Sequence, residues 1–175
     1  MTKPNYIVGI GASAGGLEAL EVFFANIAPH TGVTYLVIQH LSPDFKSMMA
    51  EILRRYTTLP IYEMENGMRV EADSIYLNIP RHDVRIRHGR LVLTPSSPAS
   101  TAVRPINLFF ESLAEDYGQH AIGVILSGSG QDGAKGVSAI HAARGLTLVQ
   151  GLETALFSGM PQSATRAVPE ALILA

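Results

Sequence analysis

The sequence predicts an α/β domain built on a doubly wound, mostly parallel, Rossmann-like sheet. Short continuous apolar runs at 6–10, 34–38 and 121–126 alternate with segments whose apolar residues recur at helical spacing. Continuous apolar runs are typical of strands buried on both faces, and strands alternating with helices form parallel sheets. The chain has 175 residues, 47% hydrophobic and 16% charged, so we expect one domain with a sizeable core.

The first two α/β units occupy the N-terminal third of the chain. The strand at 6–10 runs into a glycine-rich turn and a helix that ends before Gly32, and the strand at 34–38 follows. Ser42 and Pro43 are then predicted to cap a second helix, since Pro is favoured at the first helical position. The expected apolar stripe of that helix consists of Phe45, Met48, Met49, Ile52, Leu53 and Tyr56.

The middle of the chain departs from this pattern. After a predicted third strand at 59–64, residues 74–95 alternate between apolar and polar positions, with His88 and Gly89 at a turn. Alternation around a short turn is typical of a β-hairpin. We therefore predict an antiparallel hairpin inserted between α/β units, followed by a Pro/Ser/Ala loop at 94–101.

The last part of the chain returns to alternating strands and helices. Pro105 opens a helix that Gly118 ends, and the strand at 121–126 leads into the glycine-rich segment 127–133 and a helix up to Gly145. The remaining predicted elements are a strand at 147–150, a short helix at 162–167 and a strand at 171–175. Because the chain stops inside that strand, we expect residues 1–175 to be a fragment of a longer protein.

Composition excludes several classes of function. The absence of Cys excludes disulfides, thiolate chemistry and cysteine metal sites, and the histidines show no metal-ligand spacing. The net charge of −2 provides no field that would attract nucleic acid. No apolar run approaches the roughly 20 residues that span a bilayer, and the N-terminus lacks the apolar core of a signal peptide. We expect a cytoplasmic protein without membrane insertion.

Three polar residues follow three of the predicted strands. Ser13 is centred in a G-x-S-x-G turn, His40 ends the second strand, and Asp132 lies just after the strand at 121–126. Carboxyl ends of parallel strands meet at one sheet edge, where ligands bind. A histidine can take the proton of a serine, and a carboxylate can orient the ring. We therefore predict Ser13 as nucleophile, His40 as base and Asp132 as orienting acid.

Each of these residues also has a purely structural interpretation. Ser13 and Asp132 are common helix-capping types, and His40 can be a core histidine. Two dinucleotide-type patterns compete as well, starting at Gly9 and at Gly128. The first lacks an acidic residue at the end of the second strand, and the second places Asp132 where a pyrophosphate would bind.

Taken together, the motifs resemble a known family. The segments 11–16 (GASAGG), 39–40 (QH), 126–133 (LSGSGQDG) and 157–161 (FSGMP) resemble the catalytic domain of the chemotaxis protein-glutamate methylesterases, CheB. The variants at 40–44 and 126–130 are most similar to those fused to a CheR-type methyltransferase. The resemblance covers nearly the whole chain and assigns the family's triad to Ser13, His40 and Asp132.

The resemblance implies a serine hydrolase that removes methyl groups from glutamate γ-methyl esters of chemoreceptors and releases methanol, with no metal or cofactor. Glutamine deamidation stays open. Implied partners are the cytoplasmic region of a methylated chemoreceptor and fused or associated signalling modules. The family usually carries a receiver domain, and residues 1–175 contain none. A non-catalytic regulatory domain with the same fold is the main alternative.

Two positions depart from the family pattern. Ala14 stands where the family commonly has Thr, and Ser129 where it commonly has Met. Both are expected near the oxyanion site, where the backbone N–H of Ala14 and of Ser129 would donate.

The basic run at 81–90 places Arg85 and Arg87 on one strand face, which is either solvated or a docking face for an acidic receptor helix. His82 is expected near the pocket.

Overall fold

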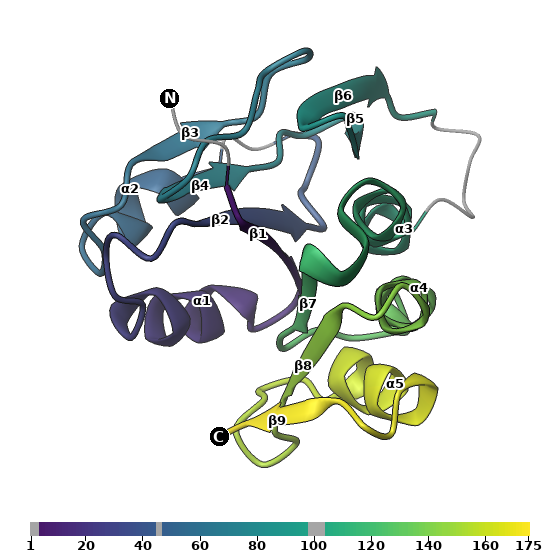
Figure 1. The fold of residues 1–175 in the computed structure, drawn as a ribbon. Coiled ribbons are helices and arrows are strands. Elements are labelled where there is room, and N and C mark those ends of the chain that lie inside the picture. Colours follow the sequence, from purple (N-terminus) through teal and green to yellow (C-terminus); the bar gives the residue numbers. More distant parts are fainter. Residues whose placement is uncertain (1–3, 45–46, 98–103) are drawn as a thin grey trace.

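The computed structural model describes residues 4–44, 47–97 and 104–175 and forms a three-layer α/β domain (Figure 1). Its central sheet has seven strands in the order β3-β4-β2-β1-β7-β8-β9, and all neighbouring pairs are parallel. This confirms the predicted fold class. The strands are β1 (Tyr6–Ala12), β2 (Val33–Gln39), β3 (Ile61–Glu63), β4 (Ser74–Leu77), β7 (Ala121–Ile125), β8 (Leu146–Gln150) and β9 (Leu172–Leu174).

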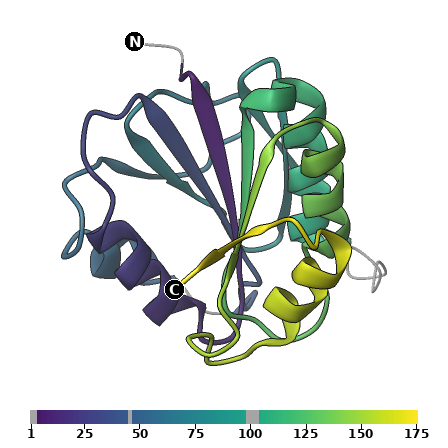
Figure 2. The same cartoon turned by 60° about the horizontal axis from the view of Figure 1, so that its bottom comes forward.

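Helices cover both faces of the sheet (Figure 2). One face packs against the first two helices, and the other against the last three together with the hairpin β5–β6. The helices are α1 (Gly16–Ala25), α2 (Met49–Leu53), α3 (Pro105–Tyr117), α4 (Ala134–Ala142) and α5 (Gly159–Ala167), and a 3₁₀ turn, η1 (Gly118–His120), follows α3. Apolar strands buried between two helical layers explain the continuous apolar runs of the sequence.

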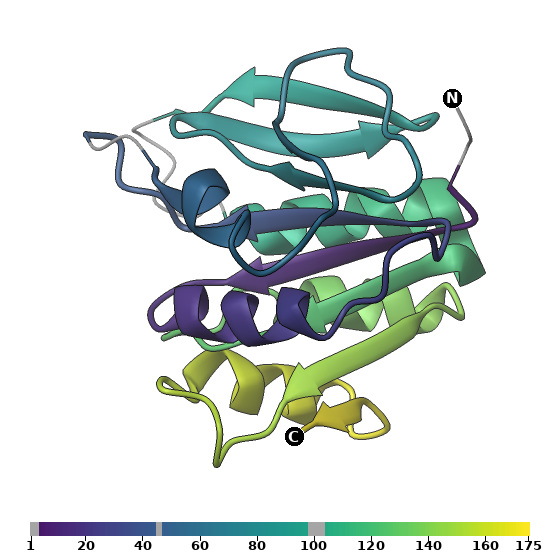
Figure 3. The same cartoon turned by 90° about the vertical axis from the view of Figure 1, so that its left-hand side faces the viewer.

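The predicted hairpin is present, but it is shorter than expected. β5 (His82–Arg87) and β6 (Arg90–Pro95) pair antiparallel (Figure 3) and pack beside α3 on the same face of the sheet (Figure 1). Val84 and Ile86 are buried, whereas Arg85 and Arg87 are exposed. Residues 74–77 were predicted as hairpin material and instead form β4 of the main sheet. All four of these residues are buried, because the sheet is covered on both faces.

The second helix also differs from expectation. It begins at Met49 rather than near Pro43, and Met48 and Tyr56 are 56% and 41% exposed. Only Met49 and Leu53 of the expected apolar stripe are buried residues of α2, while Phe45 lies outside the described residues. The periodicity therefore overestimated the length of this helix, because part of its apolar stripe has no layer to pack against.

Two glycines of β1 let a helix lie directly on the strand. A Cβ at Gly9 would come within 2.9 Å of Phe110, and a Cβ at Gly11 within 2.6 Å of Ile106, both side chains of α3. The close approach brings the first turn of α3 to the carboxyl end of β1. The two glycines of the pattern that starts at Gly9 are thus explained by packing between helix and strand.

Candidate active site

Strand register brings the three candidate residues to one edge of the sheet. Ala12 pairs with Gln39 across β1 and β2, so Ser13 and His40 are the next residues on adjacent strands. On the other side, Gly11 pairs with Ile125 of β7, which leads into the loop that carries Asp132. Parallel pairing therefore delivers all three residues to the carboxyl edge, as the sequence predicts.

Ser13 lies in a tight turn between β1 and α1. Its N–H donates to the carbonyl of Ser127 at 3.0 Å, and its own carbonyl accepts from Gly16 at 2.8 Å. Gly15 is the N-cap of α1 with φ of 69°, and a Cβ there would lie 2.7 Å from the Ser127 hydroxyl. Ser13 is therefore not a helix cap, and its hydroxyl is available for other contacts.

The imidazole of His40 connects the serine to the carboxylate. Nδ1 lies 3.0 Å from Ser13 Oγ, and Nε2 lies 2.7 Å from Asp132 Oδ2. The side chain is 37% exposed, so His40 is not a core histidine. Asn78, which follows β4, holds the preceding residue: it accepts from Gln39 N–H at 3.0 Å and donates to its carbonyl at 2.8 Å.

Asp132 is buried, with 4% of its surface exposed, and it accepts hydrogen bonds from three directions. Besides His40, the N–H of Ile106 donates to Oδ2 at 3.1 Å, and the N–H of Asn107 donates to Oδ1 at 2.9 Å. The ionised carboxylate of Asp132 can only accept, so Nε2 of His40 carries the proton and donates it in this hydrogen bond, and the Nδ1 lone pair faces the serine hydroxyl. Asp132 does not cap its own helix, whose N-cap is Gly133.

The backbone beside Ser13 is held by Ser127, which is fully buried. Its hydroxyl donates to the carbonyl of Ala14 at 2.8 Å and accepts from Phe157 N–H at 2.9 Å. Its own N–H donates to Gln150 Oε1 at 2.8 Å. One side chain thereby ties together the loops after β1, β7 and β8.

These hydrogen bonds determine which backbone N–H groups beside Ser13 are already paired. The N–H of Ser13 is occupied, whereas within the described ranges no acceptor faces the N–H of Ala14. Ser129 is exposed on the neighbouring loop, and Gly128 packs against Ser13, since a Cβ there would lie 3.0 Å from Ser13 Cβ. The donor role of Ala14 and Ser129 stays a prediction.

Sequence reasoning missed four residues that position this site: Asn78, Asn107, Ser127 and Gln150. Each is a polar residue at a strand end or in the first turn of a helix, where ordinary capping explains it equally well. The hydrogen bonds by which these residues position the site join groups that are 23 or more residues apart in the chain. The local pattern therefore carries no signal for them beyond their place after a buried strand.

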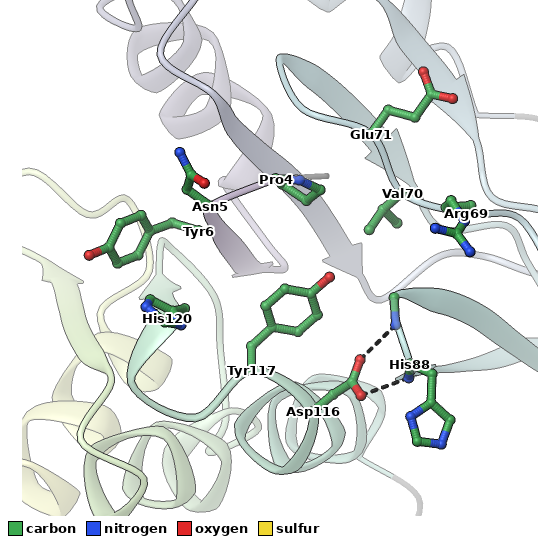
Figure 4. Close-up of a pocket in the computed structure, with 11 residues that line it drawn as sticks. Pro4, Asn5, Tyr6, Arg69, Val70, Glu71, His88, Asp116, Tyr117 and His120 are labelled. Atoms are coloured by element: carbon green, nitrogen blue, oxygen red, sulfur yellow. Dashed lines mark hydrogen bonds between the residues drawn. The ribbon is translucent and has the colours of Figure 1, made fainter. Parts of the chain in front are cut away.

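Two hollows lie at opposite edges of the sheet. A cavity of about 250 Å³ borders His40 and is lined by Asn78, Pro80, His82 and Pro105, which places His82 where the sequence predicted it. A larger hollow of about 1050 Å³ lies at the amino edge, beside Tyr6, Arg69, Tyr117 and His120 (Figure 4). Its residues include no serine near an imidazole. The larger hollow therefore has no nucleophile–base pair, whereas the smaller one borders the imidazole that contacts Ser13.

Within residues 4–44, 47–97 and 104–175, no three His, Asp or Glu side chains are grouped to hold a metal ion. None of the helices in these ranges has the length and apolarity needed to cross a bilayer.

Comparison with known proteins finds similar sequences over most of the chain. The family model described as CheB methylesterase matches residues 8–175. A protein-glutamate methylesterase/protein-glutamine glutaminase of Hahella chejuensis is 33% identical over 161 residues, and one of Cupriavidus metallidurans is 36% identical over 165 residues. The alignments cover 91% and 93% of this chain but 46% and 48% of those relatives. The chain thus spans about half the length of the curated relatives it matches.

A solved structure shows the same architecture. The catalytic domain of the CheB methylesterase of Thermotoga maritima superposes with a TM-score of 0.82 at 27% sequence identity. The match covers 98% of this chain and 93% of that domain. The similarity therefore extends over the whole sheet and both helical layers.

Proposed function

Because the chain belongs to the CheB methylesterase family, we propose that it is the catalytic part of a protein-glutamate methylesterase. The substrate is the γ-methyl ester of a glutamate in the cytoplasmic region of a chemoreceptor, and the products are the glutamate and methanol. The hydrogen-bonded sequence Ser13–His40–Asp132 carries this proposal. The names of the relatives support it, as does the fold shared with the Thermotoga domain.

In the proposed mechanism, Ser13 Oγ attacks the ester carbonyl carbon while Nδ1 of His40 takes the hydroxyl proton. The carbonyl electron pair moves to the oxygen, and the N–H of Ala14 is placed to donate to that oxyanion. Asp132 holds the ring and stabilises the imidazolium through Nε2. When the intermediate collapses, the proton on Nδ1 passes to the methoxy oxygen and methanol leaves.

The second half of the reaction uses water. His40 takes a proton from water, the resulting hydroxide attacks the acyl-enzyme, and the ester bond to Ser13 breaks as the serine recovers its proton. Glutamine deamidation would follow the same steps with ammonia as the leaving group. The relatives named for both activities support this second reaction as part of the proposal. No metal or cofactor enters either sequence of steps.

Receptor docking is assigned to the outer face of the hairpin. Arg85 and Arg87 are exposed on that face, while Val84 and Ile86 anchor the hairpin by its buried face. Within the described residues, the ion pairs of the protein are His40–Asp132 and Arg81–Asp44, so neither arginine is neutralised by a carboxylate. An acidic receptor segment complements these charges, and the additional length of the relatives leaves room for further signalling modules.

The proposal is tested by methanol release from a methylated chemoreceptor and by labelling with a serine-directed phosphonate. Wild-type protein is expected to release methanol and to be labelled at Ser13, and Ser13→Ala to do neither. A wild-type protein that is not labelled and releases no methanol would instead support the alternative of a non-catalytic domain with the methylesterase fold.

A further inference from the structure

We infer that Asn107 is a positioning residue of the triad, because it fixes Asp132 through an exchange of hydrogen bonds between the first turns of α3 and α4. For its effect on turnover, this inference rests on the proposed function. Its structural part concerns only how the carboxylate and the imidazole are held.

The first half of the exchange runs from α3 to Asp132. The N-cap of α3 is Arg104, whose side chain makes no capping bond. The N–H groups of Ile106 and Asn107, in the first turn of α3, donate instead to the two oxygens of Asp132 at 3.1 and 2.9 Å. The open end of this helix is thus satisfied by a carboxylate from another loop, and the helix dipole favours its negative charge.

The second half runs in the opposite direction. The N-cap of α4 is Gly133, which has no side chain to offer. Asn107 Oδ1 accepts from Gly133 N–H and from Gly136 N–H, each at 2.9 Å. Each helix therefore receives its cap from the segment at the start of the other helix.

The exchange controls the position of Asp132 because the two bonded groups are neighbours in the chain. Gly133 directly follows Asp132, so Asn107 holds the peptide unit that carries the carboxylate, while its own N–H holds Oδ1. Asn107 and Asp132 are both buried, at 6% and 4% exposed. A rotation of Asp132 would break its 2.7 Å contact with His40 Nε2 and free the imidazole to turn away from Ser13.

The amide also suits this position better than a carboxylate. Aspartate at 107 would accept the same two N–H bonds, since acidic groups are favoured at helix N-termini. It would also place a second negative charge beside Asp132 and so favour the charged form of His40. Asn107 supplies the acceptor without that charge.

The experiment compares Asn107→Ala and Asn107→Asp with the control Ser112→Ala. Ser112 is a buried polar residue of the same helix; its hydroxyl accepts from Ile86 N–H at 3.0 Å and donates to Phe109 O at 2.7 Å, without contact to Asp132. The readouts are kcat and KM for methyl-ester hydrolysis, the pH profile of kcat/KM, thermal unfolding, and the NMR signal of the His40 Nε2 proton.

Asn107→Ala is expected to lower kcat about 100-fold with KM little changed, because the triad geometry loosens. Its Nε2 proton signal should be lost through exchange with water. Asn107→Asp is expected to lower thermal stability, because it buries a second carboxylate beside Asp132, and to move the acid limb of the pH profile upward by about one unit. Ser112→Ala should lower stability with kcat and the Nε2 signal unchanged.

A kcat for Asn107→Ala within about twofold of wild type, or an equal loss in Ser112→Ala, would overturn the inference. So would an Nε2 proton signal that survives in folded Asn107→Ala. Because this signal is measured without substrate, it tests the positioning role even if the wild-type protein shows no esterase activity, in which case the proposed function alone fails.

Discussion

Two aspartates at the two ends of α3 make nearly the same backbone contacts. Asp132 accepts from the N–H groups of Ile106 and Asn107 at the start of the helix, and Asp116, in its last turn, accepts from those of His88 and Gly89 at 2.7 and 2.9 Å (Figure 4). Only Asp132 also contacts an imidazole. A carboxylate that accepts from two backbone N–H groups therefore holds two segments of the chain together. To take part in catalysis, it must also contact a histidine, as Asp132 does with His40 at the end of β2.

The two edges of the sheet also differ in the size of their hollows. The amino edge holds the larger one, of about 1050 Å³, and the carboxyl edge holds the smaller one, of about 250 Å³. The candidate triad lies beside the smaller hollow, so strand polarity rather than cavity size determines its location. Tight turns and helix N-termini follow the carboxyl ends of parallel strands.

Ser13→Ala is expected to reduce methanol release on the order of 10⁶-fold, because the nucleophile is lost. Since Ser13 does not cap α1, thermal unfolding should remain close to that of wild type. Turnover of methylated receptor measures the effect, and circular dichroism checks the fold. Undiminished turnover would remove Ser13 from the mechanism.

The paired variants Asp132→Asn and Asp116→Asn compare the two aspartates directly. Asp132→Asn should lower kcat on the order of 10⁴-fold, because an amide cannot accept from His40 and from both backbone N–H groups. Asp116→Asn should leave kcat unchanged and lower the free energy of unfolding by about 1 kcal/mol. Steady-state kinetics and chemical denaturation give both values, and equal kinetic losses in the two variants would contradict the assignment of roles to the two edges.

Ser127→Ala is expected to lower kcat about 100-fold with little change in KM. The carbonyl of Ala14 and the N–H of Phe157 lose their hydroxyl partner, so the turn that presents Ser13 and the Ala14 donor loosens. The rate of phosphonate labelling should fall in parallel. Ser138→Ala is the matched control, since its hydroxyl bonds only within α4, to Ala134 O at 3.2 Å; a similar loss there would argue against a role for Ser127 at the site.

Charge reversal on the hairpin tests receptor docking. The double variant Arg85→Glu and Arg87→Glu should raise KM for methylated receptor about 10-fold, while KM for a small methyl ester stays the same. The double variant Arg54→Glu and Arg55→Glu changes the charge equally on exposed residues after α2 and serves as control. An equal rise in KM for both double variants would point to net charge rather than to a docking face.

The smallest effect concerns the amino edge at high pH. Burial, and then the charge of Asp116, raise the pKa of Tyr117 above 10.0. The unfolded chain therefore releases this proton first, and the free energy of unfolding decreases as pH rises through and beyond that value. Tyr117→Phe should flatten this dependence between about pH 9 and pH 11 without changing kcat at neutral pH. Denaturation at several pH values measures the slope, and an unchanged slope would contradict the role of this hydroxyl.

Most of the fold could be predicted because the burial of a strand or helix requires a recognisable pattern of apolar residues in its own segment of the sequence. A strand covered on both faces requires a continuous apolar run, as at 34–38, and the order of strands and helices requires parallel pairing. The same rule predicted one shared edge for Ser13, His40 and Asp132. Residues 74–77 were misassigned because a four-residue buried strand beside a hairpin has too few positions to separate continuous from alternating burial.

The sequence pattern alone predicted the parallel sheet apart from β4, its polarity, and the three side chains that emerge at one edge. Only the tertiary structure decided that Ser13 and Asp132 do not cap the helices they precede, that His40 joins them at 3.0 and 2.7 Å, and that Asn107 and Ser127 hold them in place. The reason is physical. Hydrophobic periodicity is written along the chain, whereas a hydrogen bond between loops far apart in sequence depends on strand register and helix packing, which appear only when the elements assemble.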